Sequence, residues 1–151
     1  MSLQIATVVS NIAALTVANV DILDTDKTPT AVTTRANTSI LMPLPAFITE
    51  PRMERDSFGG GSVAKMTMEY RLNYRFFLAP LSSYRNNTLA WLPDLVERVA
   101  ASLDEVLEID TLGGCVDIVP GEVTNMGVVN DPSDVAFYGC DMQFIVTEFI
   151  N

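Results

Sequence analysis

The sequence predicts an α+β fold: a mainly antiparallel sheet with two helices packed on one face and a long projecting β-hairpin. Residues 65–76 alternate between apolar and polar side chains, as a half-buried strand does. Two other segments, at residues 3–17 and 88–108, repeat apolar residues at helical spacing. No strand–helix–strand unit recurs at regular intervals, which argues against a doubly wound parallel sheet. A chain of 151 residues predicts one domain, 1–151.

The long strand at residues 62–78 dominates this prediction. At ~3.3 Å per residue it spans roughly 50 Å if unbroken, whereas a domain of this size is about 40 Å across. Three glycines precede it, so we expect a hairpin whose tip projects and contacts another subunit. Pro51, in the first arm, is expected at an open edge or a bulge. The candidate interface residues are Arg52, Arg55, Phe58, Gly59, Gly60, Gly61 and Lys65.

The first half of the chain holds one helix and three short extended segments. Ile5, Val8, Ile12 and Leu15 follow helical spacing, and Ser2 is the expected N-cap. The next elements expected are, in order, a strand at 20–23, a polar loop at 24–38, a strand at 39–42 ended by Pro43 and Pro45, and the first hairpin arm at 47–58.

The second half begins with the longer helix, at residues 88–108. Asn87 or Thr88 is its expected cap, and Pro93 fits the first turn, where its missing N–H costs nothing. Its apolar stripe, which is expected to pack on Tyr70, Leu72, Tyr74 and Phe144, contains Trp91, Leu95, Val99 and Leu103. The remaining elements expected are a helix stop at Gly113–Gly114 and strands at 115–119, 122–129 and 136–149, with a turn at Pro120–Gly121.

The charge of the chain is unevenly distributed. The whole sequence has 9 Lys and Arg against 19 Asp and Glu, a net charge of −10. All 9 basic residues lie within residues 1–98, and residues 99–151 carry only acids. Nonspecific DNA binding uses Lys and Arg to neutralise phosphates, so the last third is expected to repel DNA. An acidic face that only keeps the protein in solution explains the same pattern.

Motifs for catalysis or cofactor binding are missing from the sequence. Without histidine, the Ser-His-Asp and Cys-His arrangements and histidine metal ligands are excluded. The three glycines lack the Gly-Lys-Ser/Thr of a P-loop, and the acids at residues 21–26 lack the EF-hand pattern. Cys115 and Cys140, without CxxC spacing, are expected to be small buried hydrophobes. The sequence therefore predicts a protein that is not an enzyme, with no cofactor, no metal and no membrane span.

Five segments of the chain together form a recognisable pattern. They are VDILD at 20–24, ILMPLP at 40–45, YRLNYRFFL at 70–78, VTNMGVV at 123–129 and the last strand with Tyr138-Gly139-Cys140 and Thr147-Glu148-Phe149. This pattern resembles the tail terminator (tail completion) proteins of long-tailed bacteriophages. The resemblance implies a homohexameric ring at the head-proximal end of the tail tube. Such a ring ends tube polymerisation and joins the tail to the head connector.

The resemblance also implies partners and a location. The partners are further copies of the chain, the major tail tube protein and a head-side connector or head completion protein, with DNA passing through the channel unbound. The location is the virion neck, after assembly in the host cytoplasm. Two alternatives stay open: another neck or head–tail joining protein, or a small cytosolic non-enzymatic binding module. The candidate lumen residues are Asp117, Glu122, Asp131, Asp134 and Asp141.

Overall fold

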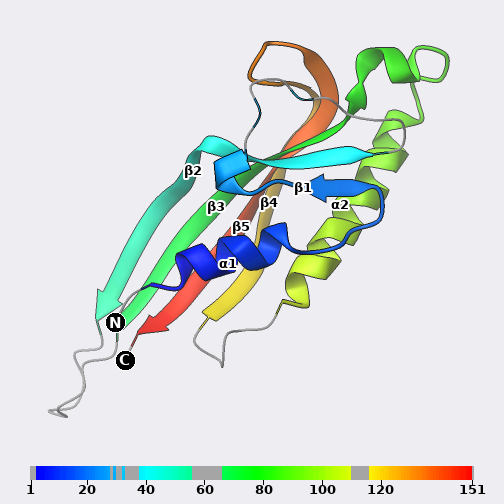
Figure 1. Cartoon of the computed structure of the whole chain (residues 1–151). Coiled ribbons are helices and arrows are strands. Elements are labelled where there is room, and N and C mark those ends of the chain that lie inside the picture. Colours follow the sequence, from blue (N-terminus) through cyan, green and yellow to red (C-terminus); the bar gives the residue numbers. More distant parts are fainter. Residues whose placement is uncertain are drawn as a thin grey trace, which may run out of the picture.

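The computed structural model has a mixed α+β architecture with a curled, mainly antiparallel sheet (Figure 1). It describes residues 3–27, 29, 32, 38–55, 66–109 and 116–150. Within these residues the strand order is β1-β2-β3-β5-β4, and only β1 and β2 are parallel. The elements are α1 (Ile5–Ala13), β1 (Val20–Ile22), the 3-10 helix η1 (Thr25–Lys27), β2 (Ser39–Arg55), β3 (Met66–Pro80), the 3-10 helix η2 (Leu81–Tyr84), α2 (Trp91–Leu107), β4 (Val116–Asn130) and β5 (Ala136–Ile150).

Proline placement explains much of the strand order. Proline has no N–H to give to a neighbouring strand, so it is confined to edges, strand ends and bulges. β3 carries proline only at its last residue and β5 carries none, and these two strands lie in the middle of the sheet. The outer strands β2 and β4 contain the other strand prolines, namely Pro43, Pro45, Pro51 and Pro120.

The predicted breaks at Pro43–Pro45 and at Pro120–Gly121 are wrong, because β2 and β4 continue through them. The register instead shifts between Pro43 and Ile48 and between Pro120 and Val123. An outer strand can continue past a proline, because the missing N–H falls in an irregular stretch where the register shifts. The bulge expected at Pro51 is confirmed, since the β2 register shifts between Thr49 and Arg52.

The alternation predicted for the long strand is confirmed in β3. Tyr70, Leu72 and Tyr74 are buried, whereas Arg71 on the other parity is partly exposed. β3 pairs with β5 along its whole length, from Met66 opposite Ile150 onward. The described part of β3 therefore does not extend beyond the sheet. The tip expected to project falls at residues 56–65, outside the described residues.

The main hydrophobic core joins the sheet to residues of both helices. Val8 and Ile12 of α1 and Leu95 and Val99 of α2 belong to it. The four side chains expected opposite the α2 stripe belong to it too: Tyr70, Leu72, Tyr74 and Phe144. Aromatic edge contacts tighten this core, for example between Tyr74 and Phe144, whose ring centroids lie 5.5 Å apart.

A smaller core forms on the other face of the sheet, near the C-terminal end of β3. Its central contact is an edge-on pair between Phe77 and Phe137, at 5.4 Å between ring centroids. Val32, from the segment expected to be a loop, is buried in it. The curled sheet thus buries side chains from both of its faces. The buried members of this core are Val32, Ile40, Met42, Phe77, Val129 and Phe137.

Both helices differ from prediction at their ends. α1 covers Ile5–Ala13 instead of 3–17, and α2 begins at Trp91 instead of 88. The expected caps Asn87 and Thr88 are wrong, because the N-cap of α2 is Ala90, whose methyl side chain cannot accept a hydrogen bond. Asn87 instead lies in a turn before the helix, where its carbonyl accepts a bond from the Ala90 N–H. The expected cap Ser2 lies outside the described residues. No helix in the described residues is long and apolar enough to cross a membrane.

We expect Leu95→Ala to lower the free energy of unfolding by about 2–5 kcal/mol, because Leu95 is fully buried and truncation leaves a cavity. Its neighbour Val96 is 49% exposed, so Val96→Ala is the matched control and is expected to change stability by about 0.5 kcal/mol or less. Urea unfolding of both variants gives the values. A cost below about 1 kcal/mol for Leu95→Ala would contradict the assignment of this stripe to the core.

Candidate interaction surfaces

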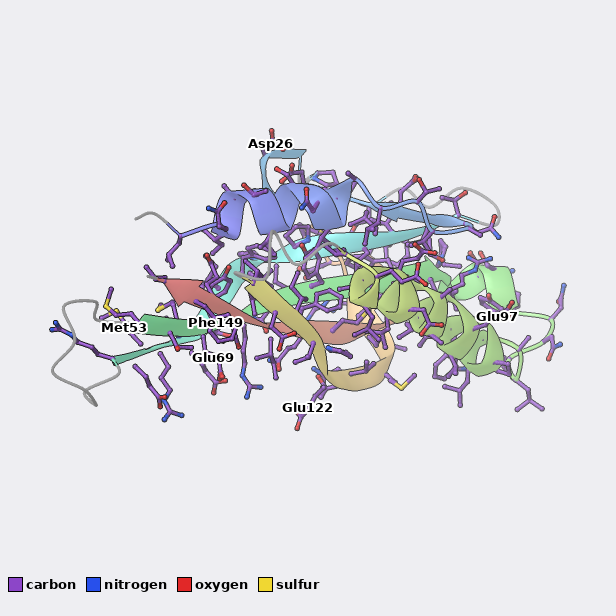
Figure 2. All side chains as sticks on the ribbon, turned by 90° about the horizontal axis from the view of Figure 1, so that it is seen from below. Asp26, Met53, Glu69, Glu97, Glu122 and Phe149 are labelled. Carbon is purple, nitrogen blue, oxygen red and sulfur yellow. The ribbon has the colours of Figure 1, made fainter. Side chains whose placement is uncertain are left out.

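Exposed acids lie on α2 and β4, which pack against each other. Asp104 and Glu108 are exposed on and just after α2, and Asp117 and Glu122 are exposed on β4. In Figure 2, Glu122 points away from the ribbon on the side opposite Asp26. No Lys or Arg follows Arg98 in the sequence, so β4 carries no cation. The one cation of α2 is Arg98, which donates to the Ser39 hydroxyl. We call these four residues the acidic side.

Two of the five candidate lumen residues are structural acids. Asp131 is only 5% exposed, so the expectation that it points outward is wrong. Its carboxylate accepts hydrogen bonds from the N–H of Val32 at 2.9 Å, of Ser133 at 2.9 Å and of Val135 at 2.8 Å. Burial alone would raise the pKa of Asp131, but these hydrogen bonds outweigh it and lower the pKa. Asp131 thus shapes the turn before β5 and holds the backbone of Val32.

Asp141 is the second structural acid. Arg75 donates to it through Nε at 2.7 Å, and Asn125 donates at 2.7 Å. Burial would raise the pKa of Asp141, but the hydrogen bonds from Arg75 and Asn125 and the charge of Arg75 lower it. The arginine offsets the charge of Asp141. The other three candidates, Asp117, Glu122 and Asp134, are exposed.

The sheet face on which Arg71 and Asn73 lie carries a ladder of hydrogen-bonded polar side chains. Arg71 donates to Gln143 at 3.1 Å, Gln143 donates to Asn73 at 3.0 Å, and Asn73 donates to Thr49 at 2.8 Å. This ladder links β5, β3 and β2. Phe149 lies on the same parity and is 49% exposed. Nothing in the described chain buries Phe149.

The distal arm, residues 52–55 at the end of β2, presents two different faces. Met53 is 64% exposed and lies opposite Met68 in register, and Arg55 lies opposite Met66. Alternation therefore places Met53 and Arg55 on one face and Arg52 and Glu54 on the other. Of the predicted interface residues, Arg52 and Arg55 lie here and are exposed. The others, Phe58, Gly59, Gly60, Gly61 and Lys65, are outside the described residues.

The other charged residues described in β2 form ion pairs. Arg52 pairs with Glu54 on the same strand. Arg71 on β3 pairs with Glu50 on the neighbouring strand β2 at 2.6 Å. No ion pair of the described residues includes Arg55.

A pocket of about 370 Å³ lies between α1, η1 and β2. Its apolar lining includes Ile5 and Val9 of α1 and Phe47 of β2, and the residues around η1 add Asp24 and Asp26. Asp26 is exposed, and Figure 2 shows it at the outer end of η1, on the α1 side of the molecule. Sequence reasoning missed this pocket, because its three walls are far apart in the chain.

Glu148 is a buried carboxylate that the sequence analysis named only as part of the Thr147-Glu148-Phe149 motif, with no role assigned to it. It is 2% exposed and accepts hydrogen bonds from the Tyr70 hydroxyl at 2.6 Å and from the Gln4 N–H at the start of α1. Burial raises the pKa of Tyr70 and the Glu148 carboxylate raises it further, so the phenol keeps its proton. The available signal was parity, because Glu148 follows Phe144 and Val146 on the buried side of β5. It joins the first helix to the last strand.

Cys140 is fully buried, and burial raises the pKa of its thiol to about 12. The thiol is therefore neutral and packs as a small hydrophobe, as the sequence predicts. Cys115 lies outside the described residues. The described residues hold no group of three or more His, Cys, Asp or Glu arranged to bind a metal ion.

Compared with known protein families and with curated protein sequences, the chain matches none. Its function is therefore inferred from its own residues and contacts. The features available for that inference are the acidic side, the distal arm, the polar ladder with Phe149, and the pocket between α1, η1 and β2.

We expect Asp131→Asn to lower the unfolding temperature at pH 7, because the amide cannot replace a carboxylate that accepts several N–H bonds. The folded-state pKa of Asp131 lies below the ordinary 3.8. Its contribution is thus fully present above pH 3.8 and is lost as the pH falls through the folded-state pKa. Thermal unfolding should show the gap between wild type and variant narrowing below pH 3.8. A gap that stays constant would contradict this role, and Asp134→Asn, in the same turn, is the charge-matched control.

Proposed function

We propose that this chain is a structural protein that assembles into a homo-oligomeric ring. More particularly, we propose a phage tail terminator: a hexameric ring at the head-proximal end of the tail tube that ends tube polymerisation and joins the tail to the head connector. Its partners are then further copies of itself, the tube protein and a head-side protein, in the virion neck. Within this proposal both helices cover one face of the sheet, and the β2–β3 hairpin projects toward a neighbouring subunit.

The acidic side is the observation that carries this proposal. A channel that passes DNA must repel phosphates along its wall, since Lys and Arg would hold the DNA by displacing its counterions. Asp104, Glu108, Asp117 and Glu122 are exposed on two elements that pack together and carry no cation after Arg98. Solubility alone does not require so few cations on these two elements, because mixed charges serve it as well.

Exposed apolar side chains support self-association. Leu92, Val96 and Leu107 are exposed on α2, and Met53 is exposed on the distal arm. Exposed apolar residues that occur together mark interaction sites more often than isolated ones do. A ring built head to tail needs two different surfaces on each subunit, and these groups lie on different elements of the fold.

The ring proposal predicts that the acidic side keeps DNA from sticking. The paired variant Asp117→Lys with Glu122→Lys should make assembled rings retain DNA, with affinity that falls steeply as salt rises. Asp117→Asn with Glu122→Gln should leave folding intact and give little retention, because these side chains are exposed. DNA retention by purified rings at low and high salt is the measurement.

The control for this experiment is a lysine at the other edge of the sheet. Asp21 is exposed on β1, whereas Glu122 is on β4, and these strands are the two edges. Single Asp21→Lys and Glu122→Lys chains carry equal charge, so a lumen on the β4 side predicts stronger retention by Glu122→Lys. Equal retention would show that position does not matter. If negative-stain images of the wild type show no rings, the proposed function is wrong.

A further inference from the structure

We propose that the pocket between α1, η1 and β2 receives the distal arm of a second copy of this chain, with Met53 in its apolar floor and Arg55 beside Asp26. This inference rests on the proposed ring and names one of its subunit contacts. It makes the contact heterologous, because the arm and the pocket are different surfaces of the same chain.

The pocket fits one or two apolar side chains of a partner better than it fits water. Ile5, Val9, Phe47 and Ile48 line it, and Ile48 is exposed in the single chain. Its volume of about 370 Å³ exceeds what a single methionine fills, so part of the arm backbone can enter as well. Covering Ile48 and Phe47 would remove apolar surface from water, which favours association.

Met53 is suited to enter such a site. It is the most exposed of the methionines described in β2 and β3. An unbranched thioether adapts to an irregular apolar wall and makes favourable contacts with aromatic edges such as that of Phe47. Met66 and Met68, opposite Arg55 and Met53 in register, extend the same face of the arm.

The charges of the two surfaces are complementary. Arg55 shares its face with Met53, whereas Glu54 is on the opposite face and is paired with Arg52. Glu50, the other acid of β2, is paired with Arg71. The arm therefore presents a methionine and a cation together. The pocket presents an apolar lining and the carboxylates of Asp24 and Asp26.

Geometry requires that the arm come from another copy. Ile48 and Met53 lie on the same continuous strand, β2, and five residues of strand separate them by roughly 15 Å. The arm cannot fold back into its own pocket without breaking its pairing with β3, where Met53 lies opposite Met68. A neighbour's arm meets no such restriction, and each copy then still has a free arm for the next.

The first test is disulfide formation between two different variants of the full chain. One carries Met53→Cys and the other Ser10→Cys, at an exposed pocket residue of α1. Mild oxidation of the mixture should give a covalent dimer at least tenfold more abundant than either variant gives alone. The separate variants measure the background from the two native cysteines. Met53→Cys mixed with Thr124→Cys, which is exposed on β4, is the control for random collision and should stay at that background.

The second test exchanges the proposed ion pair. Arg55→Glu and Asp26→Arg should each raise the protein concentration needed for ring assembly by about tenfold, and the chain with both changes should assemble at a concentration closer to that of the wild type. Light scattering and negative-stain images give these concentrations. The inference is overturned if rings form normally, the cysteine mixture gives no specific dimer and the charge exchange has no effect. That result leaves the proposed function standing.

Two other outcomes are equally decisive. Wild-type protein that forms no rings at any concentration refutes the proposed function itself. A small molecule that co-purifies in the pocket, detected by native mass spectrometry and lost in a folded Ala6→Trp variant at an exposed pocket residue, assigns the pocket to that ligand and overturns the inference. In that case the ring contact must lie elsewhere.

Discussion

The pairing of β3 with β5 is the interaction on which the rest of the structure depends. These two strands are paired from Met66–Ile150 to Pro80–Phe137. On one side β2 pairs with β3 and carries β1, and on the other side β4 pairs with β5. Their buried parity supplies the floor of the main core, which includes Tyr74, Phe144 and Val146. Their other parity carries the polar ladder. The pairing of β3 with β5 thus determines which side chains are buried in the core and which lie on the opposite face, beside the outer strands.

The side chains of β3 were predictable because alternation is a local property of the sequence. The proline positions were misread for the opposite reason. Whether Pro43 or Pro120 ends a strand depends on which neighbour needs its N–H, and that is known only once the strand order is known. With β2 and β4 on the outside, the missing donors cost little, and the register shifts absorb them.

The candidate surfaces were only partly predictable, because a charge in a sequence does not reveal its partner. Asp131 and Asp117 look alike in the chain, yet Asp131 accepts a hydrogen bond from Val32, which is 99 residues away. The charge of Asp141 is likewise offset by Arg75, which lies on the neighbouring strand β3. The distal arm followed from local pattern, whereas the pocket needed the folded positions of α1 and η1.

The Glu148 contact fixes an order of events during synthesis. The carboxylate that accepts the Gln4 N–H lies 144 residues later in the chain, so α1 leaves the ribosome long before its partner exists. Until β5 has been made and has paired with β3, the apolar residues Val8 and Ile12 have no finished floor to cover. The first helix can therefore make its final contacts only after the central sheet has formed. In the proposed ring, a subunit would become able to receive a neighbour in the pocket beside α1 only after that point.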